Sequence, residues 1–180
     1  MTMDAVAVHS PAKVFLHYLD RLHGMLVKVA QFDADISSNA LHPTMLPLLQ
    51  QAKTAIGFSL RTCCPLAGRT IAVFGDDLYN FDSVFAQLAA TVDYLSAIPD
   101  AEFGRFEELR VETVAGSAEL NLAGWDYYQL YALPNFFFHY TMVYAVARQA
   151  GVDLGKGDFD GFHQYPSGFS FVDTRSERGA

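Results

Sequence analysis

Four long stretches of this chain carry apolar residues at a spacing of three or four, and each stretch ends at a polar loop, a proline or a glycine. The first begins at Pro11 and reaches Val29, while Lys13, Asp20 and Lys28 fall outside its apolar stripe. This spacing places the apolar side chains on one face of an α-helix, and that face must be buried against other elements. We therefore expect a bundle in which amphipathic helices cover one another.

The second and third helices follow the same pattern. The second is predicted to begin near Pro43 or Thr44, because proline is tolerated in a first turn whose N–H groups have no intrahelical acceptor. It is predicted to end before Pro65. The third is predicted over about residues 82–97, where Pro99 stops it.

Residues 109–122 show a different period, in which apolar and polar residues alternate on both sides of Gly116 and Ser117. Alternation around a glycine-containing turn is typical of a two-stranded β-hairpin. A short helix over residues 125–133 and a last long helix over about residues 135–150 are predicted to follow. The sequence thus predicts an all-α fold, a four-helix bundle with a short β-hairpin inserted between helices 3 and 4.

Length and composition favour one folded domain followed by a tail. A chain of 180 residues is long enough to bury a core, and its 51% hydrophobic and 14% aromatic content argues against disorder over most of it. We expect residues 1–161 to form the bundle. Residues 162–180 are predicted to be a C-terminal tail that is partly disordered or docks on the bundle or on a partner.

The charge balance disfavours several classes of partner. With 12 basic and 20 acidic residues the net charge is −8, so neither nucleic acid nor an anionic membrane is an expected partner. No apolar run is long enough to span a bilayer, and the N-terminal segment lacks the features of a signal peptide. Cys63 and Cys64 are adjacent and cannot easily bridge to each other, so we interpret them as structural thiols of a cytoplasmic protein.

Among the histidines, His139 has the most unusual surroundings, because it lies in FFFHY within the most apolar segment of the chain. Asn135 precedes it by four residues and so lies on the same helical face. A buried imidazole requires hydrogen-bond partners, and we expect both side chains to project into the bundle interior. The residues alone leave two interpretations open: a core histidine satisfied by Asn135 and a backbone carbonyl, or part of a functional site.

Two segments resemble a known family. The stretch ALPNFFFHYTMVYAVARQAGVDLGKGDFDG is similar to the C-terminal signature of a bacterial family of unknown function in the DinB-like (DinB/YfiT-type) superfamily of four-helix bundles. The segment HPTMLPLLQQ resembles the start of the second helix in that family. The resemblance covers about residues 12–161.

The resemblance implies a site and also a departure from it. Many members of the superfamily hold a divalent metal through one histidine of helix two and an HxxxH pair of helix four, and some are thiol-dependent transferases or isomerases. The superfamily pattern places the second histidine of the pair at His139 and the first at Asn135. The helix-two histidine falls near Gln50 or Gln51, and the pattern favours Gln51. Amide oxygens are weak ligands for transition metals, so Gln51, Asn135 and His139 together are a poor ligand set for such a metal. His42 is the only replacement ligand we consider, which leaves His139 and His42 as the metal candidates.

The GKGDF segment also belongs to the family signature and has two interpretations. In one, Lys156 and Asp158 lie at the rim of the site. In the other they lock the loop, with Asp158 accepting backbone N–H groups and Lys156 pairing with a carboxylate. The structural interpretation is preferred.

Two functional hypotheses follow. In the first, the chain is a diverged metal- or thiol-dependent enzyme whose site consists of Gln51, Asn135 and His139, with His139 as the catalytic acid/base or the sole strong metal ligand, for zinc or nickel if a metal is bound at all. In the second, a non-catalytic bundle uses these residues to bind a small molecule.

The many aromatic residues near His139 exceed what one bundle is expected to bury, so a homodimer is predicted. The aromatic residues concerned are Phe136, Phe137, Phe138, Tyr140 and Tyr144.

Overall fold

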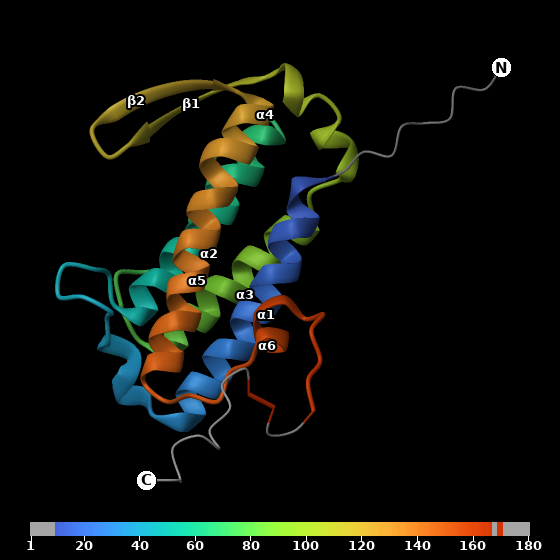
Figure 1. The fold of residues 1–180 in the computed structure, drawn as a ribbon. Coiled ribbons are helices and arrows are strands. Elements are labelled where there is room, and N and C mark those ends of the chain that lie inside the picture. Colours follow the sequence, from blue (N-terminus) through green and yellow to red (C-terminus); the bar gives the residue numbers. More distant parts are fainter. Residues whose placement is uncertain (1–9, 167–168, 171–180) are drawn as a thin grey trace, which may run out of the picture.

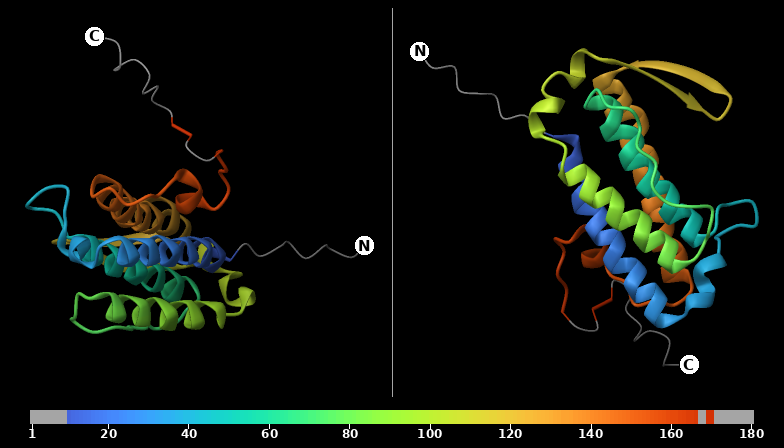
Figure 2. Two further views of the ribbon diagram at one scale, coloured as in Figure 1. Left: turned by 90° about the horizontal axis from the view of Figure 1, so that it is seen from below. Right: turned by 180° about the vertical axis from the view of Figure 1, so that it is seen from behind.

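The four long helices of the computed structural model form a bundle, as Figure 1 shows. These helices are α1 (Pro11–Phe32), α2 (Leu48–Leu66), α3 (Phe81–Ser96) and α5 (Leu133–Gln149). The structure describes residues 10–166 and 169–170. α1 and α2 lie between α5 on one side and α3 on the other (Figure 2), and the most extensive helix–helix contact in the described residues joins α2 to α5. The predicted helical bundle is confirmed.

The predicted hairpin is confirmed as well. Strands β1 (Arg110–Ala115) and β2 (Ala118–Ala123) pair antiparallel and lie across one end of the helices (Figure 1). Gly116 begins the turn with a φ of 62°, a conformation that glycine adopts without strain. The remaining short elements are η1 (Ala34–Ser38), η2 (Asp100–Phe103), η3 (Phe106–Glu108), α4 (Gly124–Asp126), η4 (Tyr127–Ala132) and α6 (Lys156–Asp160).

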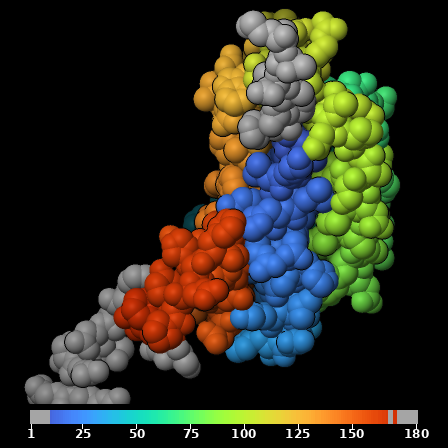
Figure 3. Space-filling model, turned by 90° about the vertical axis from the view of Figure 1, so that its right-hand side faces the viewer, coloured from blue at the N-terminus to red at the C-terminus, as the bar shows by residue number. Residues whose placement is uncertain are grey.

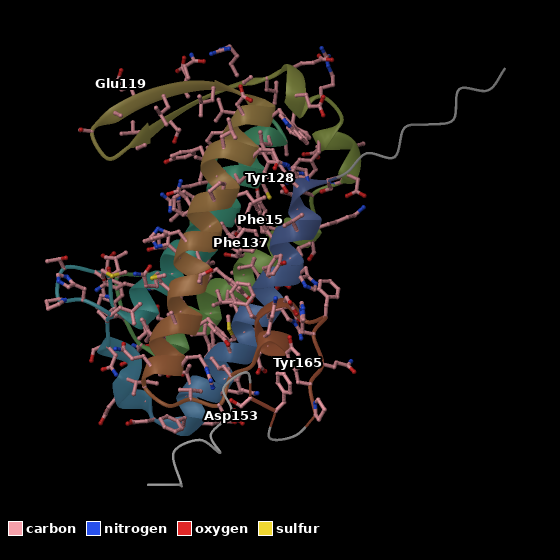
Figure 4. The ribbon with its side chains drawn as sticks, in the orientation of Figure 1. Phe15, Glu119, Tyr128, Phe137, Asp153 and Tyr165 are labelled. Atoms are coloured by element: carbon pink, nitrogen blue, oxygen red, sulfur yellow. The ribbon has the colours of Figure 1, made fainter. Side chains whose placement is uncertain are left out.

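The core is built from the apolar stripes that the sequence pattern predicts, with aromatic rings between α1 and α5. Phe15 is fully buried and meets Phe136 edge to face, with ring centroids 4.9 Å apart. Tyr128 packs against the same Phe15 ring, and Figure 4 shows Phe15, Tyr128 and Phe137 along this seam. Burial of each such side chain contributes about 2 kcal/mol to folding. The fully buried residues of α1 are Phe15, Leu19, Leu22, Met25, Leu26 and Val29.

The start of α2 differs from the sequence-based prediction. Pro43 lies in a turn in which the Met45 N–H donates to the His42 carbonyl at 2.9 Å, and the helix begins only at Leu48. A helix that began at Pro43 would need an N–H group at residue 47, where Pro47 has none. Pro47 therefore becomes the N-cap of α2.

The end of α2 also differs, since the helix continues through Pro65 to Leu66. Proline cannot donate to the carbonyl of Arg61 one turn earlier, which would leave that carbonyl without its helical partner. The Tyr127 hydroxyl donates to it at 2.8 Å instead. Burial raises the pKa of Tyr127 to about 12, so this hydroxyl keeps its proton at neutral pH. A residue distant in sequence thus permits the last turn of α2.

The predicted break at Pro134 is wrong, because α4, η4 and α5 follow one another as a single helix from Gly124 to Gln149. Its middle part is a π-helical turn, in which the Leu133 N–H donates to the carbonyl of Tyr128, five residues earlier. Pro134 follows this turn directly, at the point where the hydrogen bonding changes from the π-helical to the α-helical pattern, and a residue without an N–H is accommodated there. The first residue of this helix, Gly124, must be a glycine, because a Cβ atom there would lie 1.8 Å from the Phe106 carbonyl oxygen.

The segment after α5 lies against α1, as Figure 3 shows. Asp158 accepts the Gly155 N–H at 2.8 Å and pairs with Lys28 of α1, also at 2.8 Å. The backbone hydrogen bond predicted for Asp158 is therefore present, whereas the predicted ion pair of Lys156 with a carboxylate is not formed within the described residues. His17 binds the Asp160 carbonyl at 2.8 Å and adds a second link to α1.

Part of the predicted C-terminal tail, residues 162–180, lies outside the described residues. Residues 162–166 and 169–170 follow α6, whereas residues 167–168 and 171–180 lie outside the described residues.

Within the described part of the chain, no helix combines the length and the apolar character needed to cross a bilayer.

Phe136 and Phe138 test this account of the core, because they lie on the same helix with opposite exposure. Phe136 is 0% exposed and Phe138 is 52% exposed. Phe136→Ala is expected to lower the free energy of unfolding by about 3–5 kcal/mol, since it opens a cavity beside Phe15. Phe138→Ala is expected to change it by less than about 0.5 kcal/mol. Urea denaturation of both variants measures the difference, and equal losses would contradict the assignment of the core face.

Candidate functional site

A hydrogen bond between Gln51 and His139 joins α2 to α5. The His139 Nδ1 atom lies 2.7 Å from the Gln51 Oε1 atom, although the residues are 88 positions apart in the sequence. Gln51 is 2% exposed and His139 is half-buried. Two of the three residues predicted to form the site are therefore in direct contact.

The second hydrogen bond of Gln51 fixes the orientation of its amide. The Nε2 group donates to the Leu46 carbonyl at 3.1 Å, so the oxygen of the amide faces His139. An amide oxygen only accepts, and the imidazole must therefore carry its proton on Nδ1. In neutral His139 the lone pair is then on Nε2.

The surroundings of His139 keep its imidazole neutral. Burial and the nearby charge of Arg61 both lower the pKa of His139, in that order of importance. A histidine with a pKa below the usual value is uncharged at pH 7. The side chain therefore presents a basic nitrogen on Nε2 at neutral pH.

Two residues of α2 that the sequence reasoning missed complete the surroundings. The Phe58 ring stacks on the His139 ring, with centroids 5.6 Å apart and an angle of 21° between the planes. The Arg61 guanidinium lies 3.9 Å from the centroid of the same Phe58 ring. Phe58 follows Gln51 by two helical turns and so shares its face, a spacing that could have indicated it. No comparable signal identified Arg61, because an arginine on a helix is most often a solvated surface residue.

The third predicted residue, Asn135, is partnered within its own helix. Its side-chain Nδ2 group donates to the Tyr131 carbonyl at 2.7 Å. The structure therefore does not join Asn135 to the Gln51–His139 pair. The side-chain amide of Asn135 instead donates to a backbone carbonyl near the end of the π-helical turn.

His42 lies in an exposed loop, where its Nδ1 atom is 2.9 Å from the Thr44 hydroxyl. The surface hollow that it lines also includes Val146, Gln149 and Ala150 of α5. Val146 follows His139 by seven residues, which is about 10 Å along a helix axis. The structure therefore places His42 away from His139, at the far end of α5.

These positions decide how well the superfamily metal site fits the chain. Gln51 uses its oxygen toward His139 and its nitrogen toward Leu46, so His139 Nε2 is the one strong donor of the three aligned positions. No group of three or more His, Cys, Asp or Glu side chains suited to a metal exists among the described residues. A transition-metal site needs at least three such donors, and this donor set does not fit one.

The adjacent cysteines are both buried and free. Burial raises the pKa of the Cys63 thiol well above its usual value, so the thiol stays protonated and unreactive at neutral pH. The structural role of the pair stays a prediction, which the burial of both side chains supports.

Comparison with known proteins identifies first the fold class of this chain and then its family. The fold is similar to the crystal structure of a DinB family member protein from Shewanella denitrificans, with a TM-score of 0.74 and 23% sequence identity, over 86% of this chain and 91% of that one. This likeness shows a DinB-like fold. A family model described as Domain of unknown function (DUF1993) matches residues 9–160, and the chain belongs to that family. A search of curated proteins finds no match.

The state of His139 can be measured directly. We expect its pKa to lie below about 6.5 and its neutral form to carry the proton on Nδ1, because Gln51 accepts there. Nitrogen-15 NMR of the imidazoles across pH 5–8 measures both properties, with exposed His42 as an internal reference. A neutral His139 protonated on Nε2 would contradict the proposed orientation of Gln51.

The same pKa shift predicts a pH dependence of stability. Because the folded pKa of His139 is lowered, the unfolded chain binds the proton more tightly. The free energy of unfolding should therefore fall as the pH drops from about 6.5 to the folded pKa, and should not depend on this group above pH 6.5. His139→Gln should show a smaller fall than the wild type in denaturation experiments over this range. An identical pH profile in the two proteins would contradict the shift.

Proposed function

We propose that the chain is an enzyme of proton transfer in which His139 Nε2 is the general base. The observation that carries the proposal is the hydrogen bond from His139 Nδ1–H to Gln51, which leaves the lone pair on the other nitrogen. A general base works best when it is neutral and its pKa lies near the working pH. The lowered pKa of His139 meets the first condition, and its half-buried position leaves the ring open to a small molecule.

Gln51 is a positioning residue in this proposal. Its oxygen can accept from Nδ1–H in both the neutral and the protonated imidazole, so the ring keeps its orientation through the reaction. Because the amide carries no charge, it does not stabilise the imidazolium as a carboxylate would. Burial and Arg61 also disfavour the imidazolium, which favours the return of the proton to the product.

The proposed mechanism runs without a metal, since the donor set at the three aligned positions supplies one strong ligand. The base is a side chain of α5, its orientation comes from α2, and the proton moves between His139 Nε2 and the bound molecule. This separates the proposal from the metal-dependent chemistry that the superfamily resemblance implies.

Hydrogen exchange into small carbon acids provides the test, because it can be applied before the substrate is identified. A panel of ketones, carboxylic acids and phosphate esters is incubated in D2O with the protein, and loss of C–H signal is followed by proton NMR. His139→Gln keeps a donor toward Gln51 and should lower the exchange rate by about 10²–10⁴-fold. His42→Gln is the matched control and should retain the rate. No exchange that depends on His139 across the panel would contradict the proposal.

A non-catalytic binding role is the second candidate, and apolar residues on the outer side of the last helix favour it. Leu130 is 74% exposed and Phe138 is 52% exposed. The other four aromatic residues at this helix are buried or half-buried within one chain, so the number of rings does not by itself require a partner. The homodimer remains a proposal, which we assign to this exposed surface.

A mass measurement in solution tests the homodimer. At micromolar concentration, sedimentation or light scattering should give twice the chain mass of 19.9 kDa. Phe138→Ser should shift the equilibrium toward the monomer, whereas Phe32→Ser should not, although Phe32 is also 53% exposed. A wild-type protein with the mass of one chain would contradict the proposal.

A further inference from the structure

Arg61 is a cation without an acidic partner in the described part of the chain. Most of the described lysine and arginine side chains form ion pairs with carboxylates, as expected in a protein with 20 acidic residues. Arg61 forms none within these ranges, although it lies beside the candidate site. The ion-paired cations are Lys13, Arg21, Lys28, Lys53, Arg69 and Arg105.

The guanidinium of Arg61 is held in place without using all of its donors. Its Cζ atom lies over the Phe58 ring, 3.9 Å from the centroid, a distance typical of a cation–π contact. Its Nε–H donates to the Gly57 carbonyl at 3.3 Å. The terminal amino groups have no acceptor among the described residues. An arginine in this state presents a preformed donor fork, which suits a carboxylate or a phosphate.

The Phe58 ring contacts both Arg61 and His139. His139 stacks on the ring with centroids 5.6 Å apart, and the Arg61 charge is close enough to influence its protonation. No carboxylate stands within ion-pair distance of either side chain in the described residues, so no fixed anion competes for the cation. One free cation and one neutral base therefore share a single aromatic ring.

We propose that the site takes a small organic oxyanion, a carboxylate or a phosphate ester, whose anionic group binds Arg61 while His139 Nε2 accepts a proton from a neighbouring atom. The inference rests on the proposed function, because it names the class of substrate for the same base. In the step itself a substrate X–H bond breaks, its proton passes to Nε2, and the electron pair stays on the substrate. The new negative charge forms near the guanidinium, and the imidazolium returns the proton when product forms.

Anion binding can be measured apart from turnover. Acetate, propionate, methyl phosphate and inorganic phosphate are titrated into the full chain, and the imidazole signals of His139 are followed by NMR. Binding should be saturable, and a bound anion should raise the pKa of His139 because it neutralises Arg61. Tighter binding of the phosphates would indicate phosphate esters as the substrate class, and tighter binding of the carboxylates would indicate carboxylates.

Substitutions of Arg61 decide whether the guanidinium is responsible. Arg61→Met keeps the apolar stem and should weaken binding at least tenfold, while Arg61→Lys should have an intermediate effect, since it keeps the charge and loses the fork. Neither change removes the Arg61 carbonyl that Tyr127 binds, so the end of α2 should remain intact. Arg148→Met is the matched control, because Arg148 of α5 also lacks an ion pair in the described residues, and it should bind as the wild type does.

The outcomes separate this inference from the proposed function. If Arg61→Met binds the anions as tightly as the wild type, or if none of the four anions binds, the inference fails, while exchange that depends on His139 would leave the base assignment standing. If His139→Gln keeps full exchange activity but binding still requires Arg61, the proposed function fails and the anion site survives. Equal thermal unfolding of all variants is required for either comparison.

Discussion

The packing of α2 against α5 is the contact on which the rest of the structure depends. Both helices bury apolar faces in the core, and the polar pair of Gln51 and His139 lies within the same seam. A buried amide is costly unless both its oxygen and its nitrogen are satisfied, and Gln51 satisfies both through His139 and Leu46. The registration of the two helices and the chemical state of the imidazole therefore have the same physical origin.

Much of the fold could be predicted because it follows from local periodicity. The stripe of α1, the extent of α3 and the turn of the hairpin depend on residues near one another in the sequence. The end of α2 and the continuity of the last helix depend on more than residues that are close in the sequence. Pro65 and Pro134 are both accommodated inside helices, one through the distant hydroxyl of Tyr127 and the other through a π-helical turn. Local rules treat proline as a stop and cannot anticipate such partners.

The candidate site, like the fold, could be predicted from the sequence only in part. His139 was identified from its apolar surroundings and Gln51 through the family resemblance, and the structure brings them into contact. Asn135 was assigned by its spacing from His139, but spacing does not reveal that the Tyr131 carbonyl takes its amide. Phe58 and Arg61 were missed because their importance arises from their contact with each other and with a residue of another helix. An amide where the superfamily has a metal-binding imidazole changes the chemistry of the position from coordination to hydrogen bonding.

The π-helical turn has a consequence for how the two ends of the last helix face the core. Tyr128, Ala132, Phe136 and Tyr140 are all buried, and they are spaced four residues apart. In an uninterrupted α-helix the separation of twelve positions between the first and the last of them corresponds to about 3.3 turns, which would turn Tyr140 about 120° away from Tyr128. The wide turn absorbs one residue and restores their alignment. A related chain that is one residue shorter between positions 127 and 132 could therefore keep both its aromatic core and its imidazole in place with an ordinary α-helix.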